Sequence, residues 1–366
     1  MTESLVPQNI ESIVPYEPGK PIEEVERELG IHGAIKLASN ENPLGPSPLG
    51  TEAARAALAG ANRYPDGGAY RLRRAIAGHV GRTMEEIIVG SGSSELIDLA
   101  VRVFCRPGED EVLTHRYAFV SYRIVSQAHG VGFKQVELRP DYSVDVDALA
   151  GAIGPRTRLV FLPNPNNPTG RPVPRADFER FLERLPPGVF LVVDQAYFEY
   201  AEGGDDYPDA AAYRERHPLI ITLRTFSKIY GLAALRIGYG IADPKLVGYL
   251  NRVRLTFNVS TAGQEAARAA LGDVEYVARS RRTNVEGLVQ LEAGLANLPV
   301  QTVPTATNFI LVDLDRDAAP VYERLLRLGV IIRPLRPQGL PRHVRISIGT
   351  REENDRLLAA LGEVLA

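Results

Sequence analysis

The stretch that decides the fold is Leu219-Ile220-Ile221-Thr222-Leu223, which continues as Arg224-Thr225-Phe226-Ser227-Lys228. Its first five residues are apolar or β-branched without strict alternation, which is typical of a strand buried on both faces of a sheet. Similar short runs occur at Ile87–Val89, Val112–Leu113, Leu159–Leu162, Phe190–Val193 and Ile237–Ile241. Between some of these runs, apolar residues recur at the spacing of one helix face, as at Leu96, Leu99, Ala100, Val103 and Phe104. This alternation predicts an α/β fold whose large domain has three layers, a mostly parallel sheet with helices on both faces.

The chain has 366 residues, a length that suggests two domains. Residues 1–45 are rich in proline, asparagine and glycine, and we expect an extended arm that joins the smaller domain. Residues 46–258 carry the α/β pattern and should form the large domain. Residues 259–366 begin with an alanine-rich helical region to about Leu295, continue with strand-like runs and end in a helix. They are expected to form a small α+β domain.

Charge and cysteine content exclude several classes of protein. The net charge of −3 gives no electrostatic reason to expect a nucleic acid or an anionic membrane as partner. Cys105 is the only cysteine, so the chain has neither an internal disulfide nor a Cys-rich zinc site, in line with a reducing cytoplasm. The six histidines show no metal-binding spacing, and no apolar run approaches about 18 residues. We therefore expect a cytoplasmic protein without a bound metal.

Lys228, which follows the strand at Leu219–Leu223, is the first candidate catalytic residue. Burying an unpaired ammonium is costly, whereas a lysine that forms an imine with an aldehyde has a chemical role at such a place. Taken alone, Lys228 would more often be a loop lysine directed to solvent. Ser227 beside it offers a hydroxyl, however, and Arg236 offers parallel donors for a phosphate. The combination resembles the cofactor-lysine motif of fold-type I pyridoxal 5′-phosphate (PLP) enzymes.

A carboxylate ends another apolar strand, in Val192-Val193-Asp194-Gln195-Ala196-Tyr197. A PLP enzyme needs a carboxylate against the pyridine nitrogen, so that the ring stays protonated and accepts electrons. A helix cap or a turn explains an aspartate at such a position equally well. Tyr197, three residues on, is placed to reach the phenolic oxygen of the cofactor.

Two loops complete the pattern. Asn164-Pro165-Asn166-Asn167-Pro168-Thr169-Gly170 follows a strand and is either a rigid turn or a functional loop, in which one Asn-Pro bond is a candidate for the cis form. Gly90-Ser91-Gly92-Ser93-Ser94-Glu95 lies between a strand and a helix, where free N–H groups make either an anion site or a plain capping turn. With Lys228 present, it indicates a phosphate cradle to which Gly92, Ser93 and Ser94 contribute. Tyr117, after the strand at Val112–Leu113, would then stack on the cofactor ring, although an aromatic residue there is usually part of the core.

These segments together resemble the histidinol-phosphate aminotransferases of the fold-type I superfamily. The resemblance covers nearly the whole chain. Besides the segments above it includes residues 37–48, Arg63-Tyr64-Pro65-Asp66, Thr307-Asn308-Phe309, residues 329–334 and residues 344–350. It implies that Asn167 donates to the phenolic oxygen of the cofactor, and that Tyr64 reaches the cofactor phosphate of the neighbouring subunit in a homodimer with shared sites.

The same resemblance implies the residues that bind substrate. Arg345 would bind the carboxylate of glutamate, and Arg333 would help to hold substrate anions, in keeping with the planar guanidinium group. Asn42 would contact substrate. Tyr16 matches an arm tyrosine that touches the substrate phosphate, although a packing role is equally plausible. Three positions depart from the usual pattern, namely Arg116, Gln195 and Thr256.

The function implied is a reversible transamination between histidinol phosphate and 2-oxoglutarate in histidine biosynthesis, with Lys228, Asp194 and Tyr197 as catalytic residues. An aromatic amino acid aminotransferase and a phosphothreonine decarboxylase remain alternatives on the same scaffold. A PLP-binding regulator would add a basic helix-turn-helix domain. A nucleotide-binding protein would need a phosphate lysine next to the Gly-Ser loop.

Overall fold

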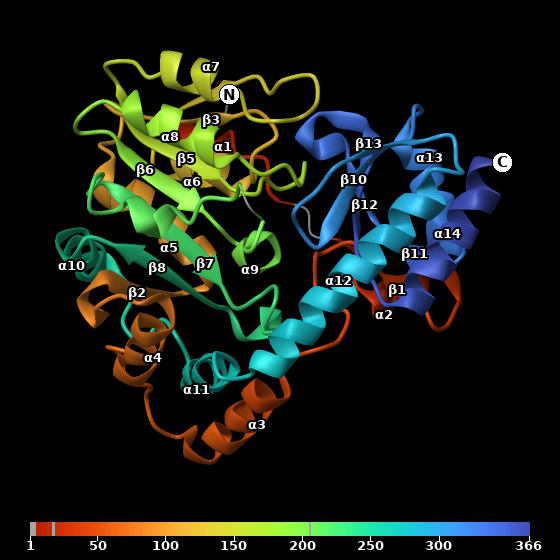
Figure 1. Cartoon of the computed structure of the whole chain (residues 1–366), viewed down its shortest axis with the longest axis horizontal. Helices are drawn as coiled ribbons and strands as arrows, with labels where there is room; N and C mark the ends of the chain where they lie inside the picture. The colour runs from red at the N-terminus through yellow and green to blue at the C-terminus, as the bar shows by residue number, and fades with distance from the viewer. Residues whose placement is uncertain (1–4, 17–18, 205) are drawn as a thin grey trace.

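The structure is a computed structural model that describes residues 5–16, 19–204 and 206–366. Figure 1 shows two lobes, a larger one built on a seven-stranded sheet and a smaller one built on a four-stranded sheet. The long helix α12 (Val274–Leu295) runs from one lobe to the other. No helix within the described ranges is long and apolar enough to cross a membrane.

The large sheet has the strand order β2-β8-β7-β6-β5-β3-β4. Its strands are β2 (Ile87–Ser91), β3 (Glu111–His115), β4 (Gly132–Val136), β5 (Thr157–Pro163), β6 (Phe190–Asp194), β7 (Ile220–Thr225) and β8 (Ile237–Ala242). β8 is antiparallel to both of its neighbours, and the other pairs are parallel. The predicted mostly parallel sheet is therefore confirmed. The edge strand β4 was not predicted, because exposed Lys134 and Gln135 interrupt its apolar pattern.

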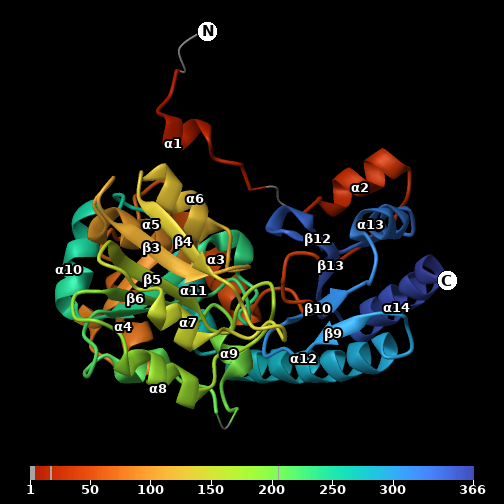
Figure 2. The same ribbon diagram turned by 90° about the horizontal axis from the view of Figure 1, so that it is seen from above.

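Helices cover both faces of this sheet (Figure 2). One face packs against α5 (Gly92–Phe104), α6 (Ser121–Ala128) and α10 (Pro244–Val253). The other face packs against α4 (Tyr70–Val80), α7 (Val146–Gly151), α8 (Arg175–Glu183) and α11 (Thr261–Ala270). Helix α3 (Pro48–Ala57) packs on α11, and the short α9 (Phe198–Ala201) follows β6. The three predicted layers are thus present.

The small lobe holds an antiparallel sheet in the order β12-β13-β10-β9. Its strands are β9 (Gln301–Val303), β10 (Phe309–Asp313), β12 (Arg333–Leu335) and β13 (Leu340–Ser347). One core joins this sheet to α12, α13 (Ala318–Arg327) and α14 (Arg351–Leu365). The predicted helical region from Thr261 to about Leu295 consists of two helices, because a turn at 271–273 separates α11 from α12.

The N-terminal segment is only partly the extended arm that its composition predicts. β1 (Ile35–Lys36) pairs with β11 (Val330–Ile331) of the small lobe, and α1 (Gln8–Glu11) lies beside α6 of the large lobe. Residues Ile22–Leu29 form helix α2, with Val25 buried and a left-handed Gly30 at its end. The domain boundaries at 45 and 258 stay a prediction.

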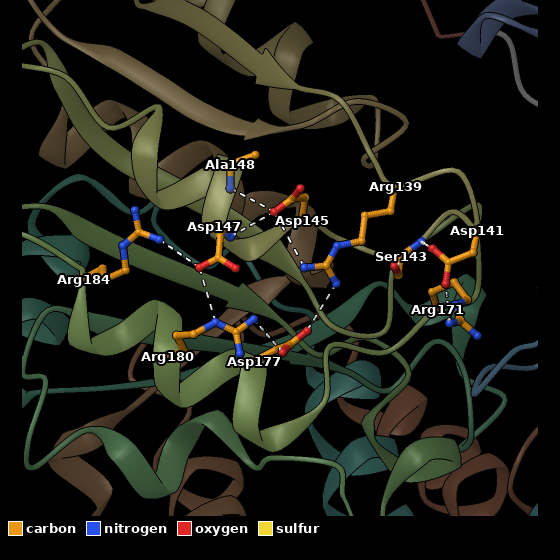
Figure 3. Close-up of polar contacts among 10 residues, drawn as sticks. All are labelled: Arg139, Asp141, Ser143, Asp145, Asp147, Ala148, Arg171, Asp177, Arg180 and Arg184. Atoms are coloured by element: carbon orange, nitrogen blue, oxygen red, sulfur yellow. Dashed lines mark hydrogen bonds and ion pairs between the residues drawn. The ribbon is translucent and has the colours of Figure 1, made fainter.

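A charged cluster on the surface joins α7 to α8 (Figure 3). Asp147 of α7 accepts hydrogen bonds from Arg184 Nη1 at 2.8 Å and from Arg180 Nε at 3.3 Å. These three side chains are each at least 40% exposed, so solvent screens each pair and its contribution to stability is small. We interpret the cluster as a link between two helices.

Candidate active site

The candidate site lies where β5, β6 and β7 end. Because these strands are parallel neighbours, their carboxyl ends meet at one edge of the sheet, with Pro163 opposite Asp194 and Asp194 opposite Leu223. A cavity of about 300 Å³ opens there. Many of the predicted residues line it: Ser93, Ser94, Asn167, Asp194, Tyr197, Ser227, Lys228 and Arg236.

Lys228 projects its amine into this cavity. The Nζ atom donates to the backbone oxygens of Asn40 and Ser39 at 3.3 and 3.4 Å. Burial lowers the pKa of Lys228 to about 8, and the charge of Arg345 acts in the same direction. The amine is therefore partly neutral near neutral pH, and the neutral amine is the nucleophilic form.

Asp194 ends β6 with its carboxylate buried in the cavity wall. Its Oδ2 accepts a hydrogen bond from Tyr122 Oη at 2.8 Å, and its Oδ1 accepts one from the backbone N–H of Ala196 at 3.2 Å. Burial raises the pKa of Asp194, whereas these two hydrogen bonds and the charge of Lys228 oppose the rise.

Tyr197 and Asn167 approach the cavity from two loops. Asn40 Nδ2 donates to the hydroxyl of Tyr197 at 2.8 Å, and burial raises the pKa of Tyr197 to about 12, so the hydroxyl keeps its proton. Asn167 follows β5 in a loop whose Asn164–Pro165 and Asn167–Pro168 bonds are both cis. The Oδ1 of Asn167 accepts a hydrogen bond from Arg345, which leaves its amide N–H groups available to another acceptor.

Donors gather at the start of helix α5. Gly92 begins the helix at φ 72°, and a Cβ atom placed on it would lie 2.6 Å from Arg236 Nη2. Arg236 Nη1 lies 3.4 Å from Ser227 Oγ. A helix N-terminus, a guanidinium and several hydroxyls make a site suited to a phosphate dianion.

A second cavity of about 200 Å³ adjoins the first and shares Lys228, Asn167 and Phe119 with it. Its wall includes Arg333 and Arg345, which are direct partners across β12 and β13. Tyr16 also lines it, with its ring centroid 5.3 Å from the Arg333 guanidinium. Two adjacent guanidiniums suit a ligand with a carboxylate or a phosphate.

The predicted site residues Tyr117 and Asn42 line neither cavity. The backbone of Tyr117 is left-handed (φ 58°), and its side chain packs against a small-lobe cluster that includes Leu335 and Leu340, so its stacking on a cofactor ring stays a prediction. Phe119, two residues on, lines both cavities instead. The amide of Asn42 donates to Ile229 O and Ser280 Oγ, both at 2.9 Å, and is buried, so a contact between Asn42 and substrate stays a prediction.

Tyr64 lies apart from both cavities. Its side chain is 83% exposed and stacks on Phe257 with ring centroids 4.7 Å apart. Tyr64 is not among the residues that line the cavity beside Lys228 in its own chain.

The residues lining the two cavities that were not predicted from the sequence include Phe119, Tyr122, Asn40 and Glu41. Phe119 and Tyr122 follow a strand end, which is a usable signal, but nothing in the sequence distinguishes them from Tyr117. Asn40 and Glu41 stand in the Asn40-Glu41-Asn42 segment that the resemblance already included.

Comparison with known proteins identifies the family. The family model of class I and II aminotransferases matches residues 32–361. A histidinol-phosphate aminotransferase of Anaeromyxobacter sp. is 48% identical over 362 residues, which are 99% of each chain. Histidinol-phosphate aminotransferase 2 of Pseudomonas aeruginosa is 47% identical over 99% of this chain and 98% of its own. The chain belongs to the histidinol-phosphate aminotransferase family.

Solved structures of aminotransferases share the fold. Histidinol-phosphate aminotransferase of Sinorhizobium meliloti, solved with pyridoxal-5′-phosphate, has a TM-score of 0.90 and 32% identity, with 99% of this chain and 98% of that chain covered. An aspartate aminotransferase of Thermus thermophilus solved with maleate has a TM-score of 0.84 and 26% identity, with 98% and 99% covered.

The residues at which this aminotransferase departs from the usual pattern have structural partners or lie at the surface. Arg116 pairs with Glu137 at 2.9 Å, and its guanidinium lies 5.0 Å from the centroid of the Tyr117 ring. Gln195 donates to Tyr207 Oη and to Pro208 O, both at 3.0 Å. Thr256 is exposed in the turn before α11.

Proposed function

We propose that this chain catalyses the reversible transfer of an amino group from histidinol phosphate to 2-oxoglutarate, giving imidazole acetol phosphate and glutamate in histidine biosynthesis. The observation that carries the proposal is that the Lys228 amine and the Asp194 carboxylate line one cavity, beside a cradle of phosphate donors. The identity of nearly half of all residues with histidinol-phosphate aminotransferases supports it.

The residues of the first cavity fit PLP. Ser93, Ser94, Ser227 and Arg236 would hold its phosphate, and the lack of space for a Cβ atom at Gly92 is what such a close cradle requires. Asp194 would face the ring nitrogen, Asn167 and Tyr197 would bind the phenolic oxygen, and Phe119 would cover one face of the ring. When bound, PLP supplies an aldehyde and a ring that accepts electrons.

Lys228 would act twice in each half-reaction. Its Nζ would first anchor the cofactor, and an incoming amine would displace it. The freed amine would then act as a general base and remove the proton from the substrate carbon that bears the nitrogen. It would next act as a general acid and deliver that proton to the aldehyde carbon of the cofactor. The lowered pKa of Lys228, about 8, favours this exchange near neutral pH.

The second cavity would bind the charged end of each substrate. Histidinol phosphate carries a phosphate and 2-oxoglutarate carries two carboxylates, and both suit the guanidiniums of Arg333 and Arg345. Tyr16 would contact the substrate phosphate from the arm segment.

The proposal includes a cytoplasmic homodimer with shared sites. Tyr64 is outside the lining of its own cavity and is largely exposed, and Leu58, which lines a surface hollow with Tyr64, is more than half exposed. A second subunit that covers this surface would place Tyr64 at the neighbouring cofactor phosphate.

The direct test compares Lys228→Ala with Lys245→Ala, a surface lysine on α10. With PLP added, wild type and Lys245→Ala should show the visible absorption band of a lysine-bound cofactor, and Lys228→Ala should not. Steady-state kinetics with histidinol phosphate, phenylalanine and phosphothreonine would follow. A visible band in Lys228→Ala, or a preference for phenylalanine or phosphothreonine, would contradict the proposal.

A further inference from the structure

The hydroxyl of Tyr122 reaches the carboxylate of Asp194 from helix α6. The distance from Tyr122 Oη to Asp194 Oδ2 is 2.8 Å, and both side chains are buried. The Tyr122 ring lies parallel to Phe161 of β5 with centroids 4.3 Å apart and planes at 4°. Phe119 meets its edge with centroids 5.8 Å apart. Packing on two sides therefore fixes the direction in which the hydroxyl points.

The hydrogen bond has a defined direction. Burial raises the pKa of the Tyr122 hydroxyl well above its ordinary value, so this group keeps its proton and is the donor of the hydrogen bond. A donated hydrogen bond favours the ionised carboxylate over the neutral acid. Within the described part of the chain, Tyr122 is the only side chain with a hydrogen bond to the Asp194 carboxylate, whose other oxygen accepts from the Ala196 N–H.

Other titratable groups face Asp194 from the elements around it. Lys228, after β7, stabilises the carboxylate by its charge, and Tyr197, before α9, keeps its proton. The charge at Lys228 would change when its amine holds a cofactor. The hydrogen bond from Tyr122 does not depend on that change.

We propose that Tyr122 is a positioning residue for transamination, which keeps Asp194 ionised and fixes the orientation of its carboxylate toward the ring nitrogen of the bound cofactor. The inference rests on the proposed function, because it assigns a purpose to Asp194 only if PLP binds. A core tyrosine without this role would contribute through packing alone.

The experiment uses Tyr122→Phe, which removes the hydroxyl and retains the ring. The matched control is Tyr213→Phe, since Tyr213 is also buried and donates to a carboxylate, Glu179 Oε1, at 2.6 Å, but lies outside both cavities. For each protein, the PLP dissociation constant would be measured against pH by the visible absorption band. Thermal unfolding of the cofactor-free proteins would be measured alongside.

We expect Tyr122→Phe to bind PLP about tenfold more weakly, and to lose affinity on the acid side about one pH unit higher than wild type does. The sign follows because a carboxylate with one donor fewer takes up its proton at a higher pH. Tyr213→Phe should follow the wild-type pH profile. In an Asp194→Asn background, Tyr122→Phe should have no further effect on the pH profile.

The inference is overturned if Tyr122→Phe keeps the wild-type pH profile, or if it shifts the profile equally with and without Asp194. It is also overturned if cofactor-free Tyr122→Phe unfolds at a far lower temperature than cofactor-free Tyr213→Phe, because the role of Tyr122 would then be structural. If the proposed function itself is wrong, the outcome is distinguishable, because the wild type would then show no visible absorption band with PLP.

Discussion

Arg345 Nη1 donates a 2.6 Å hydrogen bond to Asn167 Oδ1, and this contact joins the small lobe to the loop after β5. The Nη2 atom of the same guanidinium donates to Ala38 O at 2.7 Å. Two segments distant from β13 in the sequence therefore orient one buried guanidinium before any substrate arrives. Such preorganisation reduces the entropy lost on binding an anion.

Arg345→Lys should weaken binding of the oxo-acid substrate. A lysine keeps the charge but cannot hold Asn167, Ala38 and a carboxylate in one plane. Loss of one charge-assisted hydrogen bond, at about 1.5–3 kcal/mol, predicts a KM for 2-oxoglutarate raised by roughly 10–150-fold. Steady-state kinetics would check this, with Arg342→Lys as control, because Arg342 lies on the same strand and is 50% exposed. An unchanged KM in Arg345→Lys would show that another group binds the carboxylate.

Gly92→Ala should weaken PLP binding more than it weakens folding. The added Cβ atom would lie 2.6 Å from Arg236 Nη2 and would force that guanidinium out of the phosphate cradle. A φ of 72° also disfavours alanine. We expect the PLP dissociation constant to rise by about 10-fold or more, as measured by titration of the visible band. Gly78→Ala is the control, since a Cβ atom there meets nothing within 4 Å. Equal affinities in the two variants would refute the phosphate cradle.

The stability of the cofactor-free protein should depend on pH through Lys228. Its pKa is about 8 in the folded protein, whereas that of an unperturbed lysine is 10.5, so the unfolded chain binds more protons between these values. The free energy of unfolding contributed by Lys228 therefore rises with pH between these two values. Below pH 8 the full cost of burying the charged amine is present. Lys228→Met should be more stable than wild type at pH 7 by about 1–3 kcal/mol.

Denaturant unfolding at several pH values would measure this difference. The gap between Lys228→Met and wild type should narrow as the pH rises from 8 towards 10.5, whereas Lys245→Met should give no such trend. A gap that is constant with pH would mean that the amine is not desolvated in the folded protein.

Mixing two defective variants should restore activity if sites are shared. Tyr64→Ala and Lys228→Ala each remove a residue that a complete site needs, in the proposed arrangement from different subunits. In a mixture, half of the dimers contain one chain of each kind, and each of those has one complete site. Co-expression should thus recover up to about a quarter of the wild-type activity. Absence of recovery, with dimers confirmed by sedimentation, would place Tyr64 outside the site.

The strand ends and the residues directly after them could be predicted from sequence. Short apolar runs identify buried strands, and parallel strands bring Asn167, Asp194 and Lys228 to one edge of the sheet. The edge strand β4 could not be recognised in this way, since an exposed face carries polar residues. Helix α2 was missed because the prolines around it favoured an extended arm.

The sequence by itself determined the α/β layering, the order of the motifs and the lysine, aspartate and asparagine at the strand ends, because these depend on local pattern and on the geometry of neighbouring strands. Only the tertiary structure decided that Phe119 rather than Tyr117 faces the cavity, that hydrogen bonds to distant segments occupy Asn42, and that Tyr122 reaches Asp194. The last two outcomes depend on contacts between residues about 70 to 240 positions apart, Tyr122 with Asp194 and Asn42 with Ser280. The direction of a side chain across such a separation is set by packing and backbone turns, which no short stretch of sequence encodes.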